Sequence, residues 1–120
     1  MKKIFLLTNE NVLVGINGET DLEKLKKLLN SNTTIVARIG QKVLNKGKIF
    51  AIRYAEELNP AEHNLGVFIA NTMFNLNVED YDKALDDIEQ SANKEEFVLI
   101  DDLLFSRKVF ISAEETQSIG

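Results

Sequence analysis

The chain contains no cysteine, and its single proline and single histidine, Pro60 and His63, lie close together. Without cysteine it can form no disulfide bond, thiolate metal site or cysteine nucleophile, so a compact fold must rest on packing alone. The sequence also has no glycine-rich phosphate loop, no GxSxG nucleophile elbow and no serine–histidine pair at a recognisable spacing. These absences favour a non-enzymatic protein without a cofactor over an enzyme.

Long hydrophobic runs are also missing. No stretch approaches the roughly 18 apolar residues that a membrane-spanning helix needs, and the start, MKKIFLLTNENVLVG, reaches polar residues too early for a signal peptide. We therefore expect a cytoplasmic protein without membrane contact. Its 120 residues, 44% of them hydrophobic, predict a single domain over residues 1–112 and a flexible tail over residues 113–120.

Charges of the two signs are unevenly distributed along the chain. The formal net charge of -5 disfavours binding to nucleic acid or anionic membranes, because such binding needs Lys and Arg to displace counterions. Residues 1–55 carry ten Lys or Arg against four acids, whereas residues 77–102 carry ten acids against Lys83 and Lys94. The basic part of one chain can therefore meet the acidic part of another.

Hydrophobic periodicity predicts strands interrupted by two amphipathic helices. Leucines recur at helical spacing in residues 20–32, where Thr20 and Glu23 form a capping box at the predicted start. A second helix is predicted over residues 77–93, with Asp80 near its cap. The predicted strands are a hairpin in residues 2–18 and single strands in residues 33–40, 48–57, 66–76, 97–101 and 108–112.

The order of these elements, ββαβ-ββαβ-β, predicts an α+β fold built from two similar halves. The two helices carry matching apolar residues at a constant offset, Leu22, Leu25 and Leu29 in the first and Tyr81, Ala84 and Ile88 in the second. The order is similar to that of ferredoxin-like folds with extra strands, in which both helices cover one face of a mainly antiparallel sheet. The alternative is a longin- or roadblock-like ββαβββα order, and neither fold determines a function.

Two acidic segments are candidates for metal binding. The first includes ligand types that suit Zn²⁺ or Mn²⁺, namely Glu56, Glu57, Glu62 and His63. In the second, Asp101 and Asp102 follow a strand, as in Mg²⁺-dependent phosphotransfer folds. Because the chain has one histidine and no HExxH spacing, we expect no metal site. Residues 59–62 instead have the features of a capped helical turn between two strands.

Two arginines, Arg38 and Arg53, each lie in an otherwise apolar predicted strand. A guanidinium in such a place must be paired or must bind a ligand. If the strands are neighbours, both arginines can converge on an anionic metabolite or nucleotide, with Arg107 as a third donor and Tyr54 stacking on it. Alternatively, each arginine faces water or pairs with an acid of the second half or of another subunit.

The second helix carries an acidic face that could bind a basic partner. Its members are Asp80, Asp82, Asp86, Asp87 and Glu89. Such a face keeps many helices soluble, but it could also mimic the phosphates of DNA and so inhibit a DNA-binding protein.

Self-association is the leading hypothesis. The charge asymmetry and the exposed sheet edges expected in so small a domain favour a homodimer or higher homo-oligomer that acts through a protein partner. A small-ligand binder and an acidic inhibitor remain the alternatives.

Overall fold

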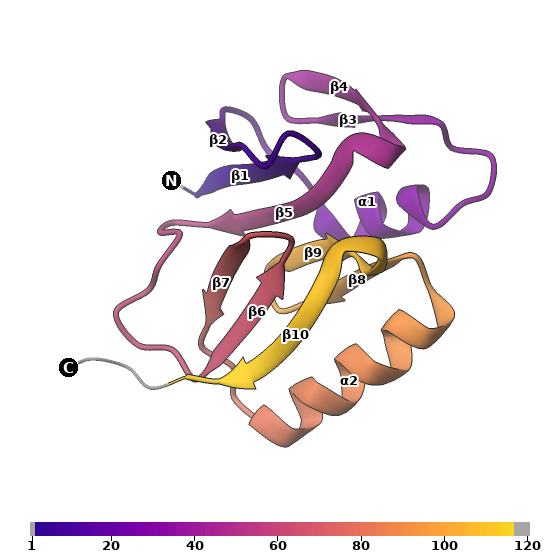
Figure 1. Ribbon diagram of the computed structural model, residues 1–120. Coiled ribbons are helices and arrows are strands. Elements are labelled where there is room, and N and C mark those ends of the chain that lie inside the picture. Colours follow the sequence, from indigo (N-terminus) through magenta and orange to yellow (C-terminus); the bar gives the residue numbers. More distant parts are fainter. Residues whose placement is uncertain (1, 117–120) are drawn as a thin grey trace.

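The computed structural model, which describes residues 2–116, contains one structural unit twice in succession (Figure 1). Repeat 1 comprises β1 (Lys3–Thr8), β2 (Leu13–Ile16), α1 (Leu22–Leu29), β3 (Val36–Ile39), β4 (Lys42–Asn45), the 3-10 turn η1 (Lys46–Lys48) and β5 (Ile49–Ala55). Repeat 2 comprises β6 (Leu65–Ile69), β7 (Thr72–Leu76), α2 (Tyr81–Lys94), β8 (Phe97–Ile100), β9 (Leu103–Ser106), η2 (Arg107–Val109) and β10 (Phe110–Glu115). The predicted α+β class is therefore confirmed. The chain does contain two similar units, but the predicted halves were bounded differently, because the strand at residues 48–57 was assigned to the second half and β5 belongs to repeat 1. Neither helix within the described part of the chain is long and apolar enough to cross a membrane.

The strands form three antiparallel sheets within residues 2–116. Their strand orders are β2-β1-β5-β9-β8, β10-β6-β7 and β3-β4. Because β9 and β8 belong to repeat 2, the five-stranded sheet crosses the boundary between the repeats, at the pairing of β5 with β9. In Figure 1 the β3-β4 hairpin lies at the opposite end of the molecule from α2 and β10.

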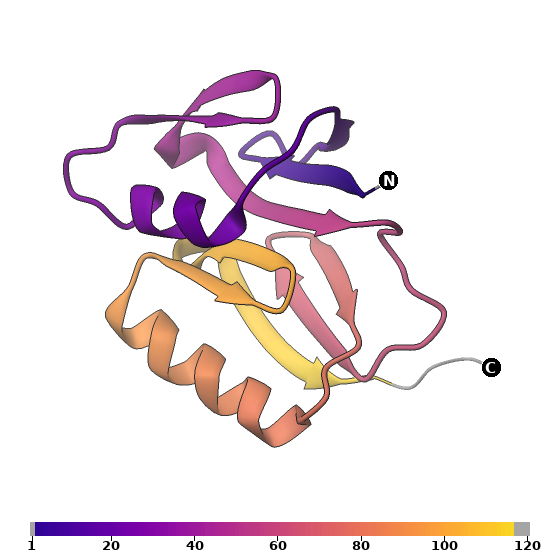
Figure 2. The same cartoon turned by 180° about the vertical axis from the view of Figure 1, so that it is seen from behind.

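Both faces of the five-stranded sheet are buried, because its apolar residues alternate between two hydrophobic clusters. On one face Ile52 and Leu104 pack with the apolar residues of α1 and with the β3-β4 hairpin. On the other face Leu7 and Phe105 pack with α2 and with the three-stranded sheet. The helices therefore lie on opposite faces of this sheet, and the prediction that both would cover one face is wrong (Figures 1 and 2).

The predicted ferredoxin-like order and its longin-like alternative are not found. The structure contains three further strands, β4, β7 and β9, which the sequence patterns did not predict as separate strands. Each follows a two-residue turn, formed by residues 40–41, 70–71 and 101–102. Ala70 and Asp101 adopt positive φ angles of 54° and 52°, a conformation that usually requires glycine. Two of the three turns therefore lack the glycine that normally reveals a hairpin in a sequence.

Aspartates cap both helices. The Asp21 side chain accepts hydrogen bonds from the Glu23 and Lys24 backbone N–H groups at 3.1 and 3.2 Å, so Asp21 is the N-cap of α1 instead of the predicted Thr20. Asp80 accepts from the Lys83 backbone N–H at 3.1 Å. These bonds satisfy N–H groups that the first turn leaves unpaired, and they fix where each helix begins.

The segment between the repeats, residues 56–64, forms bends without the predicted helical turn. Two of its polar side chains hold the segment against repeat 2 by hydrogen bonds. Asn64 bonds both the carbonyl and the N–H of Val78 at 2.8 Å, and the Nδ1 atom of His63 lies 2.7 Å from the Thr116 hydroxyl. Residues 113–115 belong to β10, so they are not part of a tail, and residues 117–120 of the predicted tail lie outside the described residues.

Candidate functional site

The two repeats match residue by residue over most of their length. In repeat 1, the pairing of β1 with β5 places Leu7 opposite Ala51. In repeat 2, the pairing of β6 with β10 places Phe68 opposite Ser112. Both members of the second pair lie 61 positions after those of the first. Both last strands also carry an irregularity in their pairing at the same place, so the residues of β1 and of β3 to β5 have their equivalents 61 positions later in repeat 2. The offset is 60 between β2 and β7, where Leu13 lies opposite Leu7 and Met73 opposite Phe68. It is 59 between the helices, whose N-caps are Asp21 and Asp80.

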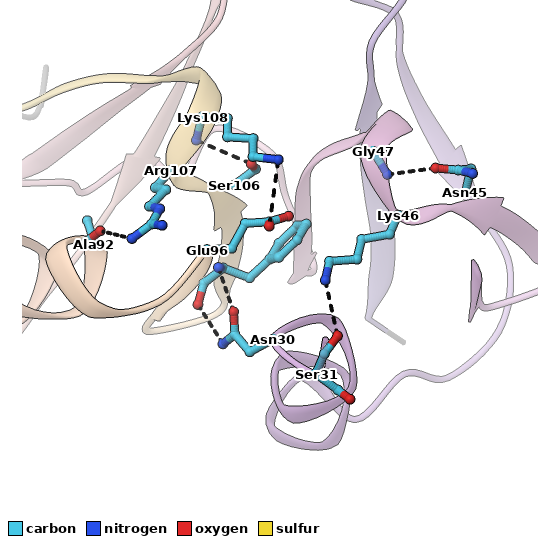
Figure 3. A network of polar contacts seen from close by, with 11 residues as sticks. Asn30, Ser31, Asn45, Lys46, Gly47, Ala92, Glu96, Ser106, Arg107 and Lys108 are labelled. Carbon is cyan, nitrogen blue, oxygen red and sulfur yellow. Dashed lines mark hydrogen bonds and ion pairs between the residues drawn. The ribbon is translucent and has the colours of Figure 1, made fainter. Parts of the chain in front are cut away.

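The two 3-10 turns show the equivalence in side-chain detail (Figure 3). Asn45 accepts a hydrogen bond from the Gly47 N–H at 2.9 Å, and Ser106 accepts one from the Lys108 N–H at 3.3 Å. The first basic residue of each turn then bonds a carbonyl near the end of the preceding helix. These bonds run from Lys46 to Ser31 at 3.2 Å and from Arg107 to Ala92 at 3.1 Å, and each repeat 2 residue is 61 positions after its counterpart.

The contact between β5 and β9, which we call the internal junction, joins the repeats through main chain and side chains. Arg53 is only 3% exposed, and its Nε lies 3.2 Å from Oδ1 of Asp102 in repeat 2. Its Nη1 donates to the Leu58 carbonyl at 2.7 Å, and the Tyr54 N–H donates to the Asp102 carbonyl at 3.0 Å. Burial raises the pKa of the Asp102 carboxyl, and the Arg53 guanidinium opposes that shift without cancelling it.

Helix α1 completes the internal junction by covering the face of the β8-β9 hairpin. The Asn30 side chain bonds the Phe97 N–H at 2.8 Å and the Phe97 carbonyl at 3.0 Å. Lys26 forms an ion pair with Glu95 at 3.4 Å. As a result Phe97 and Leu104, on the covered face, are 1% and 0% exposed.

The equivalent face in repeat 1 is open. Val36 and Val43, the counterparts of Phe97 and Leu104, are 54% and 67% exposed. Within the described residues, β4 pairs with β3 alone. We call this face of the β3-β4 hairpin, together with the free edge of β4, the hairpin surface.

Repeat 2 has a matching open surface along β10. Its Ile111 and Met73 are 64% and 40% exposed, whereas their counterparts in repeat 1, Phe50 and Leu13, pack against the core. Within residues 2–116, β10 pairs with β6 alone. We call the free edge of β10 with these side chains the β10 surface.

The two open surfaces carry opposite charges. The hairpin surface is bordered by the basic residues Arg38, Lys42 and Lys48, all exposed. The β10 surface ends in the exposed Glu114 and Glu115. Desolvation and the carboxylates of Glu115, Asp82 and Glu114 raise the pKa of Tyr81, because these acids of β10 and α2 disfavour a further negative charge on the phenol.

The structure brings together only two of the four predicted anion-binding residues, Arg53 and Tyr54. Arg38 lies exposed on β3 and donates to the Gly40 carbonyl at 3.1 Å, while Arg53 is buried on β5, in a different sheet. Arg107 bonds a helix carbonyl from η2. The Tyr54 ring lies 5.3 Å from Nζ of Lys2, and Arg53 and Tyr54 line one open pocket with Lys2 and Asp102. Arg38 and Arg107 are not part of that pocket.

The predicted acidic residues all lie on or next to α2. Asp80 caps the helix, and Asp87 forms an ion pair with Lys83 at 3.0 Å. Asp82, Asp86 and Glu89 remain exposed. The five acids therefore lie close together on the helix, and three of them take no part in the capping bond or the ion pair.

No group of three or more His, Asp or Glu side chains within the described residues is placed to hold a metal ion. No known family model, curated protein or solved structure matches the chain.

Sequence reasoning missed the apolar members of the open surfaces, which are Val36, Val43, Met73 and Ile111. Each is an ordinary strand residue, so it carries no signal by itself. The signal that could have found them is the comparison with the buried counterparts in the other repeat.

Proposed function

We propose that this protein is a non-enzymatic cytoplasmic binding protein that acts through self-association, with repeat 1 of one copy bound to repeat 2 of the next. One observation carries the proposal. The internal junction buries one surface of each repeat, and the two surfaces that would form a second such junction are both exposed within a single chain.

Burial of the open surfaces supplies part of the free energy that association needs. Full burial of an apolar side chain contributes about 1.5–3 kcal/mol, and Val36, Val43, Met73 and Ile111 are each roughly half exposed. Together they contribute about 3–6 kcal/mol by that measure. Because association costs about 4–15 kcal/mol of lost freedom, apolar contact alone does not hold the copies together, and the complementary charges must contribute.

The contact is head-to-tail, because the hairpin surface and the β10 surface are different surfaces. Each copy presents one of each, so assembly continues beyond a pair unless it closes into a ring. Opposite charges on the two surfaces also oppose contacts between two hairpin surfaces or two β10 surfaces.

Sedimentation at several protein concentrations, in low and high salt, tests this proposal. We expect a mass above that of the 13.5 kDa chain that rises with concentration and falls with salt, because salt screens the charges. A chain that is monomeric under all these conditions would overturn the proposal.

A pair of variants shows which surface is involved. Val43→Asp places an acid on the exposed hairpin surface and should abolish association, whereas Asn71→Asp adds the same charge at an exposed turn outside the hairpin surface, beside the already acidic β10 surface. Circular dichroism confirms that each variant is folded. Equal association of Val43→Asp and the parent would contradict the proposal.

A further inference from the structure

We infer that the copies join by strand addition, with β10 of one copy pairing antiparallel to β4 of the next in the register of the internal junction. This inference rests on the proposed self-association and specifies how it occurs. A free strand edge presents unpaired N–H and C=O groups that can bond another strand. Within residues 2–116, β4 and β10 each have one such edge, and their counterparts β9 and β5 pair with each other.

The internal junction predicts the register between copies. It pairs Ala51 with Phe105, Ile52 with Leu104 and Arg53 with Leu103. Adding 61 to the β5 residues and subtracting 61 from the β9 residues gives the pairs Ser112 with Leu44, Ala113 with Val43 and Glu114 with Lys42.

The transferred register is supported by the side chains that it brings together. It places the exposed carboxylate of Glu114 directly opposite the exposed ammonium group of Lys42, and opposite charges at directly paired positions stabilise a sheet. It also places Ala113 beside Val43, on the face where α1 covers Leu104 in the internal junction. A slip by one residue would turn every side chain of one strand to the other face and separate the charges.

Local geometry makes the transfer reasonable. The irregularity in pairing at Phe50 of β5 recurs at Ile111 of β10, so the two strands bend at the same place. The turns that precede them are held by equivalent hydrogen bonds (Figure 3). The β10 edge therefore has the shape that β5 offers to β9.

Cysteine cross-linking tests the register, and the cysteine-free chain gives no background. Val43→Cys and Ala113→Cys are made in separate chains and mixed under oxidising conditions. Directly paired strand residues have Cα atoms about 4.5–5.5 Å apart, within the range of a disulfide. We expect a mixed disulfide between the two variants in at least about tenfold excess over the slipped control, Val43→Cys with Ser112→Cys, whose side chains point to opposite faces.

Charge reversal tests the same register without new bonds. Lys42→Glu and Glu114→Lys should each weaken association about tenfold, because each places like charges opposite one another. The double variant Lys42→Glu/Glu114→Lys should recover most of the parent affinity, since each contact then pairs opposite charges again.

The outcomes separate this inference from the proposed function. If the parent self-associates but the in-register and slipped cysteine pairs react equally, or the double charge variant is not rescued, strand addition is wrong while self-association stands. If the parent does not self-associate at all, both proposals fail.

Discussion

The β3-β4 and β8-β9 hairpins have the same position in their repeats and opposite environments. Phe97 and Leu104 on the second hairpin are fully buried, whereas their counterparts Val36 and Val43 are more than half exposed. The difference arises outside the hairpins, because only β8-β9 pairs with a neighbouring strand and lies under a helix of the other repeat. The surroundings of a strand pair, and not its own backbone, therefore decide which of its faces are core.

The repeats also differ in charge while sharing a fold. Residues 1–55 have ten basic and four acidic residues, a balance of +6, and residues 64–120 have four basic and twelve acidic residues, a balance of -8. The same arrangement of strands and helix is thus compatible with either sign, as expected when net charge governs association and solubility and not the fold.

The largest expected difference between equivalent positions is at Leu104 and Val43. Leu104→Ala should lower the free energy of unfolding by about 2–5 kcal/mol, because it leaves a cavity between the sheet and α1. Val43→Ala should change it by no more than about 0.5 kcal/mol at an exposed position. Urea denaturation of dilute protein measures both free energies of unfolding. Equal losses in the two variants would contradict the conclusion that Leu104 is core and Val43 is not.

The next largest difference is expected at the two strand arginines. Arg53→Ala leaves the Asp102 carboxylate without its ion pair, and should cost about 2–3 kcal/mol, below the cost for a fully buried pair, because Asp102 is 29% exposed. Arg38→Ala should cost less than about 0.5 kcal/mol. Chemical denaturation tests both variants.

The same arginine variants address the anion-binding alternative. Nucleotides and carboxylates are added to the parent and to Arg53→Ala, and the melting temperature is recorded. A ligand held by Arg53 would stabilise the parent alone, and that result would favour the alternative over self-association.

Equal effects are expected at the helix caps, where the repeats agree. Asp21→Ala and Asp80→Ala should each lower the free energy of unfolding by about 1 kcal/mol, because each leaves first-turn N–H groups without an acceptor. Glu79→Ala, which removes a neighbouring acid without a capping role, is the control. A loss at one cap only would show that the two helix starts are not equivalent.

The smallest expected effect is a pH dependence at Asp102, whose counterpart Gln41 cannot ionise. Because the folded-state pKa of Asp102 is raised above its usual value of 3.8, the folded protein binds this proton more tightly than the unfolded chain. The resulting stabilisation is complete below the unfolded-state pKa and is lost as pH rises through the folded-state pKa. In Asp102→Asn this part of the decline should disappear from unfolding curves measured between pH 3 and pH 7. An unchanged pH profile would contradict the assignment.

Local patterns in the sequence predicted the parts of the fold that depend on local contacts. The helical spacing of Leu22, Leu25 and Leu29 predicted α1, and the matching residues of α2 predicted the repeat; these three leucines are buried. The strands β7 and β9 were missed because Ala70 and Asp101 form tight turns without glycine.

The internal junction had no comparable local signal. Pairing of β5 with β9 joins residues about fifty positions apart, and strand patterns do not specify partners at such separations. An acid of the second half was one predicted partner for Arg53, but only the folded chain identifies it as Asp102. The open surfaces depend on the same long-range pairing, so they too could not be predicted.

The five-stranded sheet has a consequence for synthesis on the ribosome. Its fourth strand, β9, begins at Leu103, 48 positions after β5 ends at Ala55. At roughly 5–20 residues per second, a nascent chain carries the uncovered edge of β5 and the apolar side chains beside it for about 2–10 seconds. During that interval chaperones, or neighbouring nascent chains on the same message, have access to a surface that the finished protein conceals.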